Sequence, residues 1–223
     1  MQQLKEKLRD IAFERGGRLF GVCLINDIRD DFHFEIKESS LKLNRAISIG
    51  IPVSSAVLDS LIDRPNMLYK AHYQQINHML NDIAFLIAIE IADNGYETIP
   101  IPASKILKWK PMRAHLSHRV IAHKAGLGWN GRNNLLVTPQ YGSQIRLVTV
   151  LTNAPLDIDQ PLKQDCGDCY ACLDACPVGA IDEHQENFNL EKCYAKVSEF
   201  ARPENIGSYI CGLCLEPCRG EKK

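Results

Sequence analysis

The cysteines of this chain are concentrated towards its C-terminal end. Eight of the nine lie between residues 166 and 218 of a 223-residue sequence. The first four follow the pattern C-x2-C-x2-C-x3-C-P, a fifth stands alone, and the last three form a C-x2-C-x3-C block. Thiolates two residues apart in a tight loop can face one small metal cluster, so the spacing predicts an iron–sulfur protein. The eight are Cys166, Cys169, Cys172, Cys176, Cys193, Cys211, Cys214 and Cys218.

The order of these cysteines also predicts which of them share a cluster. In the bacterial ferredoxin pattern, the cysteine that precedes proline ligates the other cluster. We therefore expect two 4Fe–4S clusters, each with four thiolate ligands. One departure is Arg219, which stands where the last block would ordinarily have proline, while Pro217 precedes the final cysteine. The expected sets are Cys166, Cys169, Cys172 and Cys218 for one cluster, and Cys176, Cys193, Cys211 and Cys214 for the other.

Three other uses of cysteine compete with this interpretation. Structural zinc favours paired C-x2-C units, whereas a C-x2-C-x2-C triplet crowds three ligands together and suits a cubane better. A disulfide scaffold needs an oxidising compartment, and the N-terminal sequence has no export signal. Ordinary buried cysteines would not share this spacing. Cys23 is different, because it lies in a short apolar run and is most simply a small core residue.

The composition is that of a globular protein without an overall electrostatic preference. The formal net charge is −1, with 24% charged residues, which gives no general footprint for nucleic acid or membranes, although a local patch could exist. The longest apolar stretch, Ile83–Ala92, is shorter than a bilayer span and contains Glu90, so it predicts a buried helix. We expect a cytoplasmic protein with no membrane attachment.

Hydrophobic periodicity predicts a mixed α/β domain over residues 1–160 and a cluster domain over 161–223. Pro100 and Pro102 place the segment 97–102 at a sheet edge, because proline cannot donate to a strand ladder. A glycine-containing turn at 139–143 predicts that the strands on either side of it form a hairpin. Helices are expected over 2–15, 65–94 and 116–124, and strands over 19–25, 46–53, 134–138 and 145–151.

The segment Gly126–Gly131 matches G-x-G-x-x-G letter for letter. A dinucleotide site would need a strand before this turn, a helix after it and an acid about 20 residues further on. Here a helical pattern precedes the turn, a strand pattern follows it, and the next acid is Asp157. The glycines more plausibly let the backbone pass close to something flat or bulky.

Two stretches resemble the epoxyqueuosine reductase family. The first is AGLGWNGRNNLLVTPQYGS, from Ala125 to Ser143, and the second is CGDCYACLDACPVGAI, from Cys166 to Ile181, with the later cysteines behind it. Order and spacing agree over roughly residues 110–220, and weaker similarity covers Tyr69–Pro102.

The resemblance implies the fold and the cofactors of that family and of the related reductive dehalogenases. It implies a nitroreductase-like or cobalamin-processing-like α/β domain, followed by a bacterial-ferredoxin-like two-cluster domain. The clusters would pass single electrons, received from a flavodoxin- or ferredoxin-type donor, to a cobalamin or another flat cofactor. By position, the cofactor-binding residues would be Ala125, Gly126, Leu127, Gly128, Trp129, Gly131, Tyr141, Gly142 and Ser143.

Two departures from the family pattern affect the expected reaction. The aspartate that acts as proton donor in the family falls on Met112, and no carboxylate lies between Glu97 and Asp157. The catalytic candidates are therefore His115 and His118, whose unperturbed pKa suits proton transfer. The chain is also short for the family, so the sequence predicts a small-molecule substrate and makes tRNA an unlikely one.

Several other residues have both a structural and a functional interpretation. Trp129 could stack on a ligand or fill the core, and Tyr69 and Tyr73 could line a pocket or the core. Arg119 and Lys124 could hold an anion or form a solvated helix face. The whole chain is expected to be a reductase, with a ferredoxin-like electron carrier as the alternative. A carrier alone would not need about 160 residues of patterned α/β domain.

Overall fold

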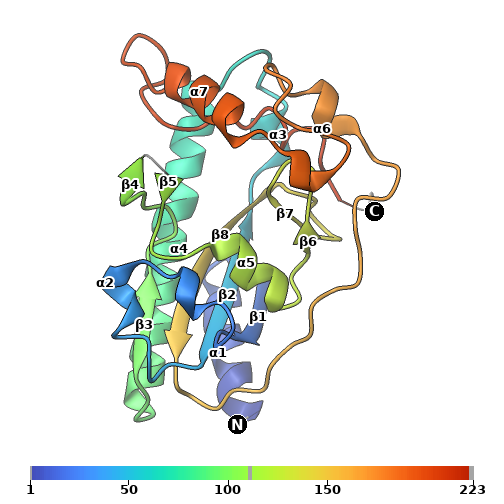
Figure 1. Cartoon of the computed structure of the whole chain (residues 1–223). Helices are drawn as coiled ribbons and strands as arrows, with labels where there is room; N and C mark the ends of the chain where they lie inside the picture. Colours follow the sequence, from blue (N-terminus) through green and yellow to red (C-terminus); the bar gives the residue numbers. More distant parts are fainter. Residues whose placement is uncertain (1, 110–111, 221–223) are drawn as a thin grey trace. The chain divides into compact units, whose positions relative to one another are not determined.

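The computed structural model describes residues 2–109 and 112–220 (Figure 1). These residues divide into two compact units. The last change from one unit to the other falls after Leu162, and the cysteine-rich unit also takes in two earlier segments. The α/β unit comprises the described residues of Met1–Ile51, Asn77–Leu127 and Arg146–Leu162. The cysteine-rich unit comprises those of Pro52–Ile76, Gly128–Ile145 and Lys163–Lys223.

The α/β unit is built on a four-stranded sheet of order β1-β2-β8-β3. β1 (Leu19–Leu24) runs antiparallel to β2 (Arg45–Pro52), and β3 (Thr98–Ile101) runs antiparallel to β8 (Ile145–Thr152). β3 forms an edge of the sheet, as predicted from Pro100 within it and Pro102 directly after it. The predicted mixed α/β class is confirmed.

Helices with an apolar face accompany this sheet. α1 (Gln2–Glu14), α4 (Met67–Asp93) and α5 (His118–Lys124) were all expected from their periodicity. The Ser117 side chain begins α5 by accepting a hydrogen bond from the Val120 amide. The short elements η1 (Arg29–Asp31) and α2 (Phe34–Lys37) lie between β1 and β2. The fully buried side chains include Leu8, Ile47, Ile49, Leu80, Ile83, Ile87, Ile91 and Ile121.

The apolar run Ile83–Ala92 is only partly buried. Ile83, Ile87 and Ile91 face the core, but Phe85 and Ile89 are 61% and 45% exposed. An α-helix has 3.6 residues per turn, so Phe85 and Ile89 do not share the buried face of the helix and point away from the core. Among the described residues, no helix combines the length and apolarity of a bilayer span.

The predicted hairpin around residues 139–143 is wrong. β7 (Leu136–Val137) pairs with β6 (Trp129–Asn130), whereas β8 lies inside the main sheet between β2 and β3. Thr138 and Gly142 exchange backbone hydrogen bonds of 2.8 and 2.9 Å, so the loop closes on itself and directs β8 elsewhere. A further pair, β4 (Lys108–Trp109) with β5 (Met112–Arg113), was not expected.

The cysteine-rich unit contains little regular structure. Its helices are α3 (Ser55–Leu58), the first part of α4, α6 (Ala171–Asp174) and α7 (Leu190–Phe200), with one 3-10 turn, η2 (Gln185–Asn187). The β6–β7 pair belongs to this unit. Most of its chain is therefore loop, which is the arrangement expected where side chains bound to a common centre replace a hydrophobic core.

Candidate metal centre

The predicted cluster ligands are close enough to influence one another. All nine cysteines lie among the described residues, and all are free thiols. Burial, followed by the neighbouring Cys218, Cys166 and Cys169, raises the pKa of Cys172 to about 11. This neighbourhood contains the four cysteines of the first expected set.

The second expected set forms a corresponding neighbourhood. Burial, followed by Cys211 and Cys176, raises the pKa of Cys193 to about 11. Burial also raises the pKa of Cys214 well above the ordinary value, with further contributions from Cys211, Cys193, Cys172 and Cys176. Such thiols stay neutral near pH 7, and converting them to the thiolates of a cluster would take a nearby cation, which iron would supply.

A cavity of about 50 Å³ lies among the cysteines of the second set. Its wall includes Cys176, Cys193, Cys211 and Cys214, together with apolar side chains such as Ile181, Phe188 and Val197. In the described part of the chain, no three His, Cys, Asp or Glu side chains converge where a single ion could sit. The four thiols instead surround a volume, and this donor set suits a cubane cluster.

Backbone and indole N–H groups point at three of the sulfurs. The indole Nε1 of Trp129 lies 3.4 Å from Cys166 Sγ, and the Ser143 amide lies 3.2 Å from Cys218 Sγ. The Ala180 amide lies 3.3 Å from Cys176 Sγ. N–H donors stabilise negative charge on sulfur, so these contacts favour the thiolate form that binds metal.

Arg132 holds the first cysteine loop in place. Its guanidinium donates to the carbonyls of Glu183, Cys169 and Gly167 at 2.6, 3.0 and 2.8 Å. It also lies 4.4 Å from the centre of the Tyr170 ring. Sequence reasoning missed Arg132, although its position directly after the glycine turn was a signal.

The loop Tyr141–Gln144 packs closely against the last cysteine block and forms hydrogen bonds with it. The Gln144 amide group donates to the carbonyls of Leu215 and Glu216 at 3.0 and 2.8 Å. A Cβ at Gly142, whose φ is +54°, would lie 2.1 Å from the Cys218 carbonyl oxygen. Only glycine allows this approach. Arg219, in the expected proline position, pairs with Asp59 and Glu216.

The glycine turn packs against the chain's own backbone. A Cβ at Gly126 would lie 2.4 Å from the Gln160 carbonyl oxygen, and one at Gly128 would lie 2.0 Å from that of Val137. A Cβ at Gly131 would likewise come too close to the Val137 side chain. The turn follows α5 and enters β6, so the context is the inverse of a dinucleotide site, as predicted.

The predicted cofactor-binding residues therefore separate into two groups. Trp129, Gly142 and Ser143 contact the predicted cluster ligands in the cysteine-rich unit, with Tyr141 in the same loop. Ala125 and Leu127 are buried in the α/β unit, where Gly21 approaches the Ala125 carbonyl. Close packing within the protein accounts for these glycines, and the role of the turn in binding a cofactor stays a prediction.

His118 is held as a neutral side chain. Its Nε2 lies 2.9 Å from the Pro102 carbonyl, which can only accept, so Nε2 carries the proton. Its Nδ1 then accepts from the Thr149 hydroxyl at 2.8 Å. Burial lowers the pKa of His118 to about 4. Both ring nitrogens thus have partners within the protein, and the catalytic role of His118 stays a prediction.

His115 has a carboxylate partner that sequence reasoning missed. Its Nε2 lies 3.1 Å from Glu35 Oε2, and the His33 ring lies edge-on to it at 6.4 Å. The His33 amide donates to the His115 carbonyl at 2.9 Å, which joins α2 to the segment before α5. The side chain of Met112, in the family aspartate position, lies outside the description.

The other candidate residues are buried or paired within the protein. Cys23 is buried, donates to the Ile121 carbonyl at 3.7 Å, and burial raises its pKa to about 12. Tyr69 is buried against Gly212 in the cysteine-rich unit, and its ring meets that of Tyr73 at 6.2 Å. Lys124 pairs with Asp27 at 2.7 Å, while burial lowers the pKa of Arg119.

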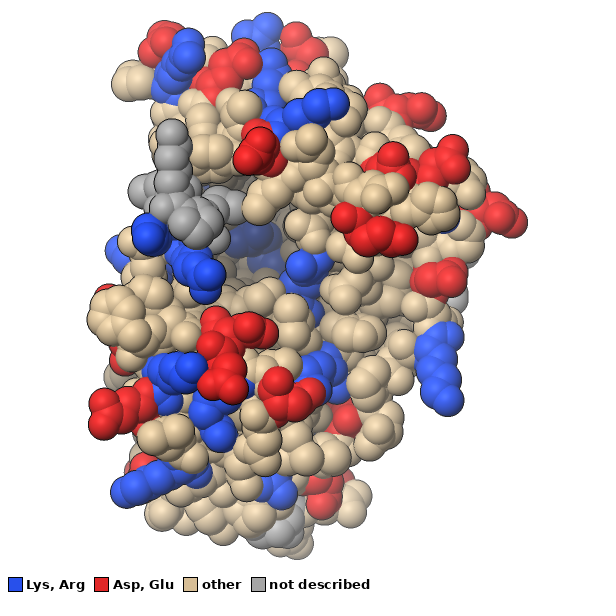
Figure 2. Space-filling model, viewed as in Figure 1, with Lys and Arg blue, Asp and Glu red and all other residues tan. Residues whose placement is uncertain are grey.

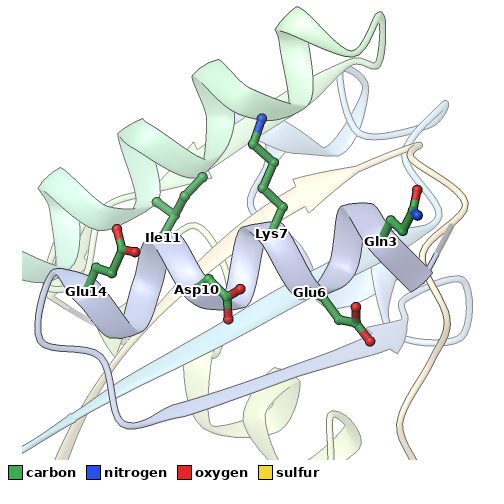
Figure 3. A pocket seen from close by; sticks show the side chains of 6 residues that line it. All are labelled: Gln3, Glu6, Lys7, Asp10, Ile11 and Glu14. Atoms are coloured by element: carbon green, nitrogen blue, oxygen red, sulfur yellow. The ribbon is translucent and has the colours of Figure 1, made fainter.

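A larger groove, of about 410 Å³, follows α1 and contains none of the predicted site residues (Figure 3). Four of its six lining side chains are charged, and one of them, Lys7, pairs with Glu90 on α4 at 2.6 Å. The groove is a solvated helix surface. Over the face in Figure 2, charges of both signs are interspersed, in keeping with the small net charge.

Fold and site together define a mixed α/β protein in which eight cysteines gather in one unit. No model of a protein family matches the chain. Among curated proteins, the epoxyqueuosine reductase of Bacillus anthracis is 36% identical over 115 residues, which are 48% of this chain and 30% of the relative. That of Aliivibrio fischeri is 29% identical over 157 residues, or 67% of this chain and 39% of the relative. These matches span only about a third of the relatives' length.

Solved structures give the same result for the fold. An epoxyqueuosine reductase in complex with an epoxyqueuosine-modified tRNA-Tyr stem loop matches 99% of this chain and 67% of its own, with a TM-score of 0.63 and 22% identity. The catabolic reductive dehalogenase NpRdhA matches 96% of this chain and 31% of its own, with a TM-score of 0.76 and 17% identity. The resemblance to epoxyqueuosine reductases and reductive dehalogenases is confirmed.

One expectation requires correction. The sequence was taken to favour a small molecule and to make tRNA an unlikely partner. That prediction is contradicted, because the relatives carry the name epoxyqueuosine reductase and one of the matching structures holds a tRNA stem loop. The short length of the chain is therefore no argument against tRNA as a partner.

Proposed function

We propose that this chain is an iron–sulfur reductase of the epoxyqueuosine reductase type, acting on epoxyqueuosine in tRNA. The observation that carries the proposal is the gathering of eight thiols into two neighbourhoods of four, one around Cys172 and one around a cavity. The relatives' names supply the reaction.

The two neighbourhoods suggest the ligand sets. Cys166, Cys169, Cys172 and Cys218 would hold one 4Fe–4S cluster, and Cys176, Cys193, Cys211 and Cys214 the other. Bound clusters supply electrons one at a time at low potential. Removing the oxygen of an epoxide takes up two electrons and two protons and releases water, so two one-electron centres match the demand.

A corrinoid is proposed from the relatives alone. One matching dehalogenase structure is described in terms of B12-dependent dehalogenation. What the structure gives at the glycine turn expected to line that cofactor is its close packing on the chain's own backbone. We therefore assign no residues to the corrinoid and derive no step through it.

The sequence itself supports an anionic substrate. Between Glu97 and Asp157 there is no acid, yet eight Lys and Arg residues occur there. The small net charge of the whole chain does not reveal that this segment is locally basic. Proteins bind nucleic-acid backbones mainly through such clustered cations. The eight are Lys105, Lys108, Lys110, Arg113, Arg119, Lys124, Arg132 and Arg146.

The β4–β5 pair carries the most exposed of these cations. Lys108 and Arg113 are opposite each other in the register, and both are exposed, as is Lys105. Like charges directly opposite destabilise a strand pair, and an anion between them would remove that cost. In the described part of the chain, none of the three forms an ion pair. A phosphate backbone is the partner this pair suits.

A turnover experiment tests the proposal. Anaerobic protein with reconstituted clusters, a low-potential chemical reductant and cobalamin is incubated with an epoxyqueuosine-modified tRNA-Tyr stem loop. Mass spectrometry should show the loss of one oxygen atom from the RNA, and the variant Cys172→Ser should abolish it. Reducible clusters without any loss of oxygen, in the presence of bound RNA, would contradict the reductase and favour an electron carrier.

A further inference from the structure

The indole of Trp129 is fixed against a predicted cluster ligand. Trp129 lies in β6 opposite Val137 of β7, and Gly128 before it packs directly on the Val137 carbonyl. These contacts leave the tryptophan little freedom, and its Nε1 lies 3.4 Å from Cys166 Sγ. The indole N–H can only donate, so the sulfur is the acceptor.

The two sets of cysteines differ in where their N–H donors originate. Cys166 and Cys218, of the first set, receive hydrogen bonds from Trp129 and Ser143, in the segment 128–145 that precedes the cysteine blocks. Cys176, of the second set, receives one from Ala180, four residues further on in its own loop. The glycine-turn segment thus adds donors to the first set.

We infer that Trp129 raises the reduction potential of the cluster held by Cys166, Cys169, Cys172 and Cys218. This inference rests on the proposed function. Reduction adds an electron that spreads onto the ligand sulfurs, and an N–H donor stabilises that extra negative charge. The hydrogen bond therefore favours the reduced state of this cluster. An electron that can occupy either cluster would occupy this one for a larger fraction of the time than it would without the bond.

The variant Trp129→Phe tests this directly, because it keeps an aromatic ring and removes the donor. EPR-monitored redox titration of the anaerobic, cluster-loaded protein should show that one of the two midpoint potentials becomes more negative while the other stays unchanged. The matched control is Tyr170→Phe. This variant alters an aromatic residue of the same cysteine loop without touching an N–H···S bond, and it should shift neither potential.

The outcomes separate this inference from the proposal beneath it. Wild-type protein that assembles no clusters overturns the proposed function and the inference with it. Trp129→Phe protein that holds all its iron and has both potentials unchanged, or both shifted equally, overturns the inference alone.

A second measurement tests the inference if the Trp129→Phe variant fails to assemble its clusters. The chain has two tryptophans, so nitrogen-15 tryptophan in a Trp109→Phe background labels Trp129 only. Pulsed EPR of the reduced protein should detect coupling between this nitrogen and one cluster. The absence of coupling from a fully loaded cluster would overturn the inference.

Discussion

At the scale of single residues, His118 shows how burial fixes a protonation state. The Pro102 carbonyl and the Thr149 hydroxyl hold the neutral ring, and burial lowers its pKa to about 4. The unfolded chain binds a proton near its ordinary pKa of about 6.5, so the unfolded state gains protons first as the pH falls. The free energy of unfolding should therefore decrease between pH 6.5 and 4, by about 3 kcal/mol at most.

Urea unfolding at a series of pH values measures this term. His118→Gln cannot titrate, so it should be less stable at neutral pH but show a flatter pH profile than the wild type in that window. Equal slopes in the two proteins would show that His118 does not titrate as its surroundings indicate.

Of the two predicted proton donors, His115 has a carboxylate partner, with 3.1 Å between its Nε2 and Glu35 Oε2. Glu35 would orient the ring as a positioning residue. We expect Glu35→Gln to lower kcat by about ten-fold or more and to move the pH profile, with KM unchanged. Glu38→Gln alters an exposed acid next to the same helix and should have no effect. A change in KM alone would instead indicate a role in binding.

The residue scale also shows the limits of the sequence. The two cysteine sets stay a prediction, which the sequence allows because ligand spacing within a loop is a local property. Glu35 could not be predicted, because 80 positions separate it from His115 and only the packing of α2 brings them together. Trp129 was noticed, but whether its ring meets a cofactor or a cysteine depends on the β6–β7 pairing.

At the scale of elements, the loop from Thr138 to Gly142 packs against the last cysteine block, and the contact is made at Gly142. Gly142→Ala would force a Cβ against the Cys218 carbonyl oxygen, so we expect roughly half of the iron to be lost, that of the first set. Gly179→Ala is the matched control, because its φ is +55°, against +54° at Gly142, and nothing lies within 4 Å of the added carbon. Equal losses in both variants would implicate backbone strain instead of the contact.

The β4–β5 pair makes a second prediction at this scale. Lys108→Ala combined with Arg113→Ala should weaken the binding of an RNA stem loop of any sequence and reduce the slope of log K against log salt by about one per lost contact. Fluorescence anisotropy at several salt concentrations measures both quantities. Lys42→Ala removes another exposed lysine and should leave the slope unchanged. Unchanged affinity in the double variant would exclude this pair as a binding surface.

Long elements were predictable and two-residue strands were not. α1, α4 and β1 carry enough periodic residues to be recognised, and the prolines of β3 placed it correctly at an edge. β4, β5 and β6 are too short to show a period. β8 was recognised as a strand, but its partners were not, because pairing is decided by distant segments.

At the scale of the whole molecule, the chain is not divided simply into an N-terminal and a C-terminal domain. The cysteine-rich unit includes 52–76 and 128–145, so the glycine-turn motif spans both units. The sequence placed the boundary by composition, which detects the cysteines but not the earlier segments that contact them. Net charge, a property of the whole chain, also averages over the acid-free segment between Glu97 and Asp157 and so does not reveal its cations.

The central claim is that eight thiols hold two clusters in crossed sets, and the most direct test is iron and sulfide analysis with EPR on anaerobic wild-type and Cys176→Ser protein. We predict about eight irons in the wild type. The variant should lose the cluster of Cys193, Cys211 and Cys214 and retain that of Cys166, Cys169 and Cys172. Zinc in place of iron, or the loss of the opposite cluster, would contradict the account.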